Sequence, residues 1–127
     1  MTMLTINRKD LTSGDDLLSE TGVEFVGIIN DKGHLEDFVG KEPQMSSGKE
    51  KEMFCMELAL QNRMMKDFDN DLGNVRYNLT EREGSKYISI PTKSKVILGV
   101  MKKDIDHTKF FNKMISTLEN SSFSSVS

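Results

Sequence analysis

A single helical segment separates two groups of strand-like runs, and this arrangement limits the folds open to the chain. Over residues 47–69 the apolar side chains recur at helical spacing, and Ser47 with Glu50 forms a capping-box arrangement at the start. At about 100° per residue, the apolar side chains cover an arc of roughly 200°, wider than the ~100° stripe of a one-sided surface helix. They are Met53, Phe54, Met56, Leu58, Leu60, Met64, Met65 and Phe68. We expect such a helix to pack on its own sheet and on a second subunit.

Two strand-like runs precede this helix. Residues 23–29 are rich in β-branched and aromatic side chains and end at residues 30–33, Asn-Asp-Lys-Gly, which is a hairpin turn signal. A short returning strand is expected over residues 34–39. Residues 15–20 predict a short helix before the first strand, ended by Gly22.

Three more strands and a helix are expected after Gly73. Val75, Tyr77 and Leu79 alternate with polar residues, which predicts a strand over residues 74–80 with one solvated face. A return strand follows at 86–90. Residues 96–101 are continuously apolar and predict a central strand covered on both faces. The last helix carries one apolar stripe, made of Phe111, Met114, Ile115 and Leu118.

This order of elements resembles the roadblock/longin-like and profilin-like architectures, in which a long helix lies between the second and third strands of a five-stranded antiparallel sheet. Residues 17–33 are similar to a roadblock start, with a short helix, a Gly-Val entry and a hairpin with Gly at its turn. Residues 64–77 also resemble an uncharacterised family of small archaeal proteins. The resemblance covers residues 17–118 and implies an α+β fold in the order helix-β-β-helix-β-β-β-helix.

The length of 127 residues suits one domain. We expect an N-terminal arm at 1–13, a single roadblock-like domain at 14–119 and a flexible Ser-rich tail at 120–127. The net charge of −3 gives no electrostatic reason to bind nucleic acid. No apolar run is long enough to insert into a membrane, and the polar N-terminal residues do not form a signal peptide. A cytoplasmic location is expected.

The sequence carries no recognisable catalytic, cofactor or metal motif. Three aspartates within residues 67–71 alternate like the start of a calcium loop, but Leu72 and Asn78 stand where that loop needs Gly and Glu. Cys55 lies among methionines, a set that favours packing over a Cu(I) site. Neither histidine has a partner at zinc-binding spacing. We therefore predict no enzyme activity, no catalytic residue, no cofactor and no metal.

The resemblance implies a function in protein binding. Roadblock domains typically dimerise through the long helix and the third strand, and they serve as scaffolds or regulators of small GTPases. We therefore predict a non-enzymatic homodimeric scaffold whose further protein partner is unknown, with a small GTPase as the candidate. The predicted dimer or partner interface consists of Phe54, Leu58, Met64, Met65, Val75, Tyr77 and Leu79.

Two other classes of function stay open. A PAS-like ligand-sensing domain shares a central antiparallel sheet and would need an apolar pocket between sheet and helix. It normally has several short helices where this chain predicts one long helix, so it ranks second. An enzyme ranks third, because it would need convergent polar groups that the sequence alone does not reveal.

Overall fold

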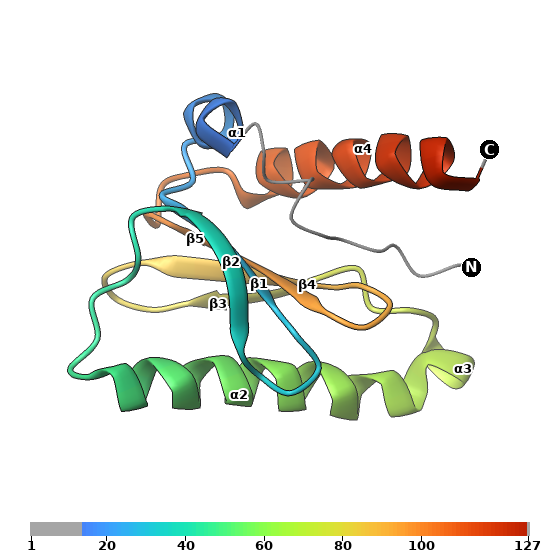
Figure 1. The fold of residues 1–127 in the computed structure, drawn as a ribbon, viewed down its shortest axis with the longest axis horizontal. Coiled ribbons are helices and arrows are strands. Elements are labelled where there is room, and N and C mark those ends of the chain that lie inside the picture. Colours follow the sequence, from blue (N-terminus) through green and yellow to red (C-terminus); the bar gives the residue numbers. More distant parts are fainter. Residues whose placement is uncertain (1–13, 127) are drawn as a thin grey trace.

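The computed structural model describes residues 14–126, with side-chain surroundings for residues 16–118. One five-stranded antiparallel sheet lies between two helical layers (Figure 1). Helix α2 (Gly48–Met65) covers one face of the sheet. Helices α1 (Gly14–Thr21) and α4 (His107–Val126) lie on the other face.

The sheet has the strand order β2-β1-β5-β4-β3, so β5 is the middle strand, β1 and β4 flank it, and β2 and β3 are the edges. The strands are β1 (Phe25–Ile29), β2 (Leu35–Gly40), β3 (Asn78–Glu81), β4 (Lys86–Pro91) and β5 (Val96–Met101). All neighbouring strands are antiparallel. The prediction that residues 96–101 form a central, doubly covered strand is confirmed.

Alternating side chains divide the core between the two faces of the sheet, because successive residues of a strand point to opposite sides. In β1, Val26 and Ile28 belong to the cluster that packs on α1 and α4, with Phe110 and Met114 of α4 at 0% exposure. Phe25 and Ile29 belong to the cluster on the α2 side. Both helical layers are therefore held by apolar burial on opposite faces of the same three strands, β1, β4 and β5.

The β1–β2 hairpin packs its turn against α2. Asn30 Oδ1 accepts hydrogen bonds from the backbone N–H groups of Lys32 and His34, both at 3.0 Å. Gly33 has φ +86°, and a Cβ there would lie 2.8 Å from the Cα of Met56. Glycine is needed here both for the positive φ and for the close approach of the turn to the helix.

Helix α2 begins as the sequence predicts. The side chain of Ser47 accepts a hydrogen bond from the Glu50 N–H at 3.2 Å, and its backbone is extended, as an N-cap requires. After Met65 the chain continues through a 3-10 turn, η2 (Lys66–Phe68), and a short helix, α3 (Asp69–Leu72). These two short elements prolong α2 beyond its last regular turn.

The third strand is shorter than predicted. The sequence pattern predicts a strand over 74–80, but β3 begins at Asn78, which pairs with Ser89 of β4. Pro91 at the end of β4 has no N–H to offer a longer ladder. Before β3, Tyr77 packs instead against Phe111 of α4, with 4.9 Å between ring centroids.

The predicted domain limits stay predictions. The arm at 1–13 lies outside the described residues. The backbone of α4 continues to Val126, across most of the predicted tail at 120–127, while the side chains there lie outside the described ones. Across the described part of the chain, each helix is too short or too polar to cross a bilayer.

Candidate functional site

Helix α2 has different chemistry on its two sides. Toward the sheet, the half-buried ring of Phe54 meets the ring of Tyr87 edge-on, with 5.2 Å between centroids. The helix buries four side chains, those of Cys55, Leu58, Ala59 and Asn62. These contacts use only the part of the predicted 200° apolar arc that faces the sheet.

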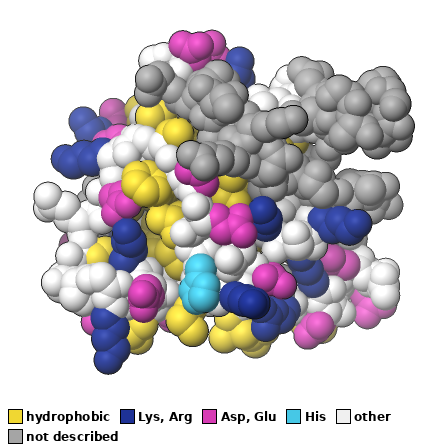
Figure 2. Space-filling model, viewed as in Figure 1, with side chains coloured by type: hydrophobic (Ala, Val, Ile, Leu, Met, Phe, Trp, Pro, Cys, Tyr) yellow, Lys and Arg dark blue, Asp and Glu magenta, His cyan; other side chains and the backbone are white. Residues whose placement is uncertain are grey.

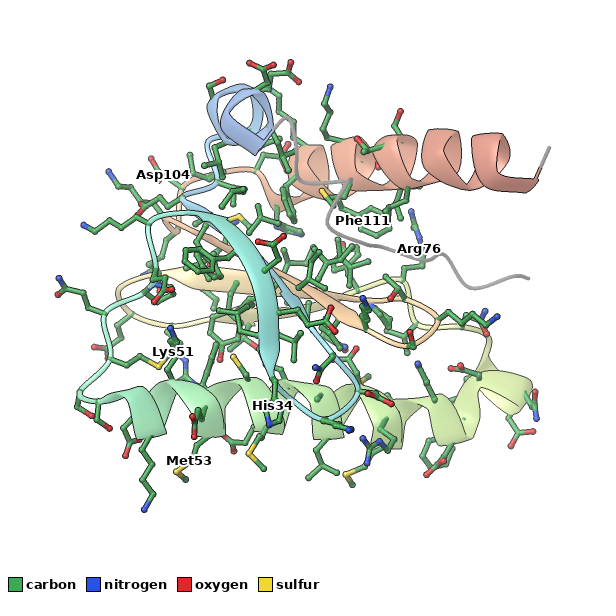
Figure 3. The ribbon with its side chains drawn as sticks, in the orientation of Figure 1. His34, Lys51, Met53, Arg76, Asp104 and Phe111 are labelled. Atoms are coloured by element: carbon green, nitrogen blue, oxygen red, sulfur yellow. The ribbon has the colours of Figure 1, made fainter. Side chains whose placement is uncertain are left out.

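The other part of the arc, continued by Leu72 of α3, forms a stripe of large apolar side chains, which we call the outer stripe. Its members are 51% to 82% exposed and are Met53, Met56, Leu60, Met64, Phe68 and Leu72. Figure 3 shows Met53 pointing away from the sheet, whereas Lys51 points toward it. In Figure 2, hydrophobic side chains appear along the lower edge of the molecule, where α2 lies in Figure 1. Contiguous exposed apolar residues of this kind mark interaction sites.

A groove of about 940 Å³ runs between the outer stripe and strand β3. One wall is apolar and includes Leu60, Met64 and Phe68. The opposite wall includes Arg82, whose Nε donates a hydrogen bond to the Tyr87 hydroxyl at 3.1 Å. A hollow of about 360 Å³, lined in part by Met53, Met56 and Leu60, flanks the stripe on its other side. A ridge between two grooves is the shape on which a second helix packs.

The structure divides the seven predicted interface residues among different surroundings. Met64 is 58% exposed on the outer stripe. The half-buried Phe54 and Met65 line the same groove as Met64, together with Leu58, which is 6% exposed and belongs to the core under α2.

The other three predicted residues lie near β3. Leu79 is 41% exposed and stands opposite Ile88, a residue of the core on the α4 side. Tyr77 packs against that same core, and Val75 is half-buried in the segment before β3. The groove therefore brings together only the four α2 residues of the predicted set.

Four of the six outer-stripe residues lie on the predicted arc but were left out of the predicted interface: Met53, Met56, Leu60 and Phe68. Their spacing of three or four residues gives the signal that would find them, because it defines one line along a helix. The strongly exposed Leu72 was also missed, since it belongs to the short helix α3 beyond the predicted end of the segment.

The two edges of the sheet differ. At β2, the carboxylate of Asp37 accepts a hydrogen bond from the N–H of Phe38 at 2.9 Å, so this edge donor is already used. At β3, the described strand pairs with β4 on one side only. An edge strand with open backbone groups is a template for pairing with another chain. The β3 edge, beside the groove, is therefore the more open of the two.

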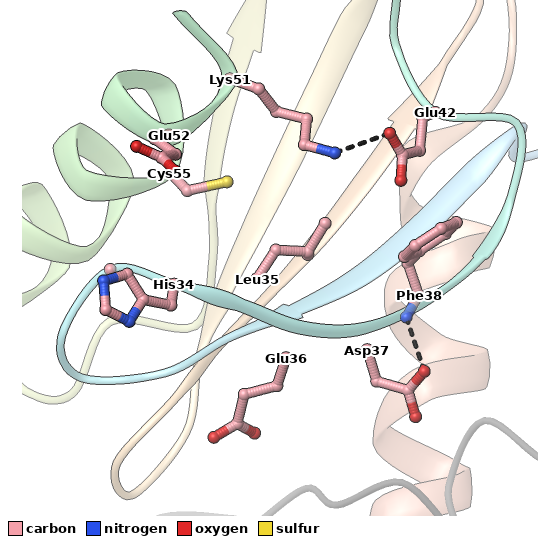
Figure 4. Close-up of a pocket in the computed structure, with 10 residues that line it drawn as sticks. His34, Leu35, Glu36, Asp37, Phe38, Glu42, Lys51, Glu52 and Cys55 are labelled. Carbon is pink, nitrogen blue, oxygen red and sulfur yellow. Dashed lines mark hydrogen bonds and ion pairs between the residues drawn. The ribbon is translucent and has the colours of Figure 1, made fainter. Parts of the chain in front are cut away.

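A hollow of about 340 Å³ lies between β2 and the N-terminal half of α2 (Figure 4). Leu35, Phe38 and Cys55 contribute apolar surface to it. Its rim is charged, and Lys51 Nζ lies 2.7 Å from Glu42 Oε2 across it. Three further carboxylates line it, those of Glu36, Asp37 and Glu52. A PAS-like sensor needs an apolar pocket between helix and sheet, and this charged hollow lends that alternative no support.

Cys55 is not poised as a nucleophile. Burial raises the pKa of its thiol above the usual value, and the nearby charge of Lys51 offsets only part of that effect. The thiolate is the reactive form of cysteine, so a raised pKa keeps the group unreactive at neutral pH. Among residues 16–118, moreover, no three His, Cys, Asp or Glu side chains gather as they would around a metal ion.

Comparison by sequence found no match, either among family models or among curated proteins. Comparison by structure found many. A Roadblock/LC7 domain from Streptomyces avermitilis has a TM-score of 0.66 at 8% identity, over 89% of this chain and 94% of that one. A structure described as MglB with tetrameric arrangement has a TM-score of 0.65 at 10% identity, over 93% and 96%. Profilin II of Acanthamoeba castellanii has a TM-score of 0.57 at 15% identity, over 84% and 90%.

At these identities the likeness shows the fold alone. The predicted α+β fold, with its five-stranded antiparallel sheet and the long helix between the second and third strands, is confirmed as roadblock/longin-like. The similarity of residues 64–77 to small archaeal proteins stays a prediction.

Proposed function

We propose that this chain, whose fold is roadblock/longin-like, is a non-enzymatic protein-interaction module in which two copies join through the outer stripe and the β3 edge. The observation that carries the proposal is the outer stripe itself. From Met53 to Phe68 it runs for about 22 Å at 1.5 Å per residue. Each of its side chains keeps at least half of its surface exposed in the single chain.

The energetics favour covering this stripe. Fully burying one large apolar side chain is worth about 1.5–3 kcal/mol. Six half-exposed side chains therefore leave several kcal/mol to be gained, which is the scale needed to offset the cost of association. A stable interface needs about 800 Å² from each partner, and the β3 edge with its adjoining groove extends the stripe toward that area.

The β3 edge gives the dimer a register. In the proposed arrangement β3 pairs antiparallel with β3 of the second copy, because a two-fold axis places the same segment of each chain opposite itself. The α2 helices then lie side by side on one face of the joined sheet, and each covers the members of the partner's outer stripe that line the groove beside β3, which are Leu60, Met64 and Phe68. The tetrameric arrangement described for the MglB structure supports self-association as a property to test in this fold.

The finer part of the proposal is a small GTPase as the second partner, which rests on the resemblance to roadblock proteins. The test is binding of a small GTPase from the same genome, loaded in turn with GDP and GTP, to the purified full chain. Nucleotide-dependent binding would support a regulatory role. If no GTPase of that genome binds in either state, this part of the proposal is lost while the dimer proposal stands.

The dimer proposal is tested by mass in solution. We expect light scattering across a dilution series to give twice the chain mass for the wild type. Met64→Asp should give a folded monomer, because Met64 is 58% exposed and its replacement places a carboxylate in the interface. Asn112→Asp, on the exposed side of α4, is the matched control and should remain a dimer. A wild type that is monomeric at all concentrations would refute the proposal.

A further inference from the structure

A basic hollow of about 190 Å³ opens at one end of the sheet, away from the groove beside β3. It lies where the β1–β2 turn and the β4–β5 turn meet the C-terminal half of α2, an arrangement that can be followed in Figure 1. Four cationic side chains line it, those of Arg63, Lys66, Lys93 and Lys95. Asp31 is the acidic residue among its lining residues. The chain as a whole has a net charge of −3, so the positive charge gathered at this hollow has the opposite sign to the net charge of the protein.

Two of these cations are oriented by groups that do not neutralise them. Arg63 donates a hydrogen bond to the backbone carbonyl of Asp31. Lys66 Nζ donates to the carbonyl of Thr92 at 3.2 Å. Carbonyl oxygens fix the positions of the side chains but carry no net charge, so both positive charges remain available to an anion. Lys95, by contrast, is paired with Glu36 at 2.8 Å.

Asn62 supplies the second, independent observation. Its side chain is 3% exposed and lines the hollow. Its Nδ2 donates to the Leu58 carbonyl at 2.8 Å, which fixes the orientation of the amide. Its Oδ1 is buried and accepts no hydrogen bond from any described residue. Buried acceptors are nearly always satisfied, so this oxygen calls for a donor.

We propose that the basic hollow binds a phosphate group that retains an O–H. Positive charge from Arg63, Lys66 and Lys93 attracts the anionic oxygens, and the P–OH donates to Asn62 Oδ1. The hollow is smaller than the 300–1,000 Å³ of usual ligand pockets, so it fits a single phosphate group rather than a nucleotide. Sulfate has a similar shape but carries no O–H at neutral pH, and it serves as the discriminating anion.

The test titrates sodium phosphate into the full chain near pH 6, at constant ionic strength, and follows binding by calorimetry and by backbone amide NMR. We expect phosphate to bind at least about tenfold more tightly than sulfate, since one hydrogen bond to a buried acceptor is lost with sulfate. Lys93→Gln should weaken phosphate binding by about tenfold. Lys102→Gln, which removes the same charge from an exposed loop elsewhere, should leave it unchanged.

Asn62→Leu keeps a side chain of similar size and removes the acceptor, so it should abolish the preference for phosphate over sulfate. If that variant does not fold, the comparison of Lys93→Gln with Lys102→Gln decides. Equal binding of phosphate and sulfate by the wild type would overturn the proposal, and so would the absence of binding or equal losses in the two lysine variants.

Glycerol 3-phosphate distinguishes the source of the phosphate group. Near pH 6 about half of a phosphate ester retains an O–H. Binding of the ester with the same preference over sulfate would assign the hollow to a phosphorylated small molecule. Binding of orthophosphate alone would assign it to the free ion. All measurements are repeated on Met64→Asp, so the result does not depend on the dimer.

Discussion

Leu58 and Leu60 are two residues apart on α2 and face opposite surroundings, so they separate folding from association. Leu58 is 6% exposed and packs in the core under the helix. Leu60 is 52% exposed on the outer stripe. We expect Leu58→Ala to destabilise the fold and Leu60→Asp to dissociate the dimer.

The magnitudes follow from the burial of each side chain. Truncating a buried leucine costs about 2–5 kcal/mol, so Leu58→Ala should lower the free energy of unfolding by that amount. In the single chain, an exposed substitution such as Leu60→Asp should change it by no more than about 0.5 kcal/mol. In the dimer, the exposed half of Leu60 is worth about 0.8–1.5 kcal/mol, and the two-fold axis doubles that loss. The dimer dissociation constant should therefore rise at least about tenfold, with the desolvated carboxylate adding to the effect.

The assay combines urea unfolding followed by circular dichroism with light scattering across a dilution series, at matched protein concentrations because dimer stability depends on concentration. Two results would refute the reasoning. One is a Leu60→Asp variant that keeps the dimer mass down to the lowest concentration. The other is a Leu58→Ala variant that dissociates without losing stability, which would mean that the sheet-facing side of α2 forms the interface.

Three further changes test the fold around the proposed sites. Gly99→Ala should lower the free energy of unfolding by about 1–3 kcal/mol in urea melts, because the new Cβ would lie 2.6 Å from Phe110 Cε2. Gly84→Ala is the control: no atom lies within 4 Å of the Cβ added there, so this variant should show no loss from overpacking. Ser47→Ala should cost about 1 kcal/mol by the same measurement through loss of the N-cap of α2, and Ser46→Ala, next to it, should be near neutral. The Thr108 hydroxyl and backbone N–H hold the pKa of Asp106 below its usual value. The ionised carboxylate therefore contributes its full stabilisation at pH values above the usual aspartate pKa, and this contribution is lost as the pH falls through the lowered pKa of the folded protein. The free energies of unfolding of the wild type and of Asp106→Asn should therefore become more similar in acid.

Much of the fold could be predicted because each element carries its own local signal. The turn at residues 30–33 contains a glycine at the position that requires positive φ, and Ser47 stands three residues before Glu50 at the start of α2. The continuous apolar run at 96–101 identifies a strand buried on both faces. The start of β3 was missed because alternation at residues 75–79 looks the same whether a side chain lies in a ladder or packs on a helix. Tyr77 packs on α4, and the alternation of apolar and polar residues gives no information about a contact with a distant helix.

The candidate sites were predictable only in part. The width of the apolar arc indicated that α2 has more than one partner. It did not indicate which half faces the sheet, because that depends on where the β1–β2 turn meets the helix at Met56. The basic hollow was out of reach altogether. Its cations come from residues 63–66 of the α2 end and residues 93–95 of the β4–β5 turn. These two segments are distant in the sequence, and only the packing of that turn against α2 brings them together.

The differences between the two edges of the sheet favour association of a second copy at β3 over association at β2. The β2 edge is flanked by carboxylates, and Asp37 already occupies an edge N–H, which discourages the addition of another strand. The β3 edge is short and borders the groove, which is also lined by Leu60, Met64 and Phe68 of the outer stripe. A second copy that pairs with β3 thus covers these three side chains in the same step, whereas one that pairs with β2 would leave them exposed. The basic hollow, set apart from β3 by the width of α2, would remain open to its ligand in the first arrangement, so phosphate binding and dimer formation should be independent of each other.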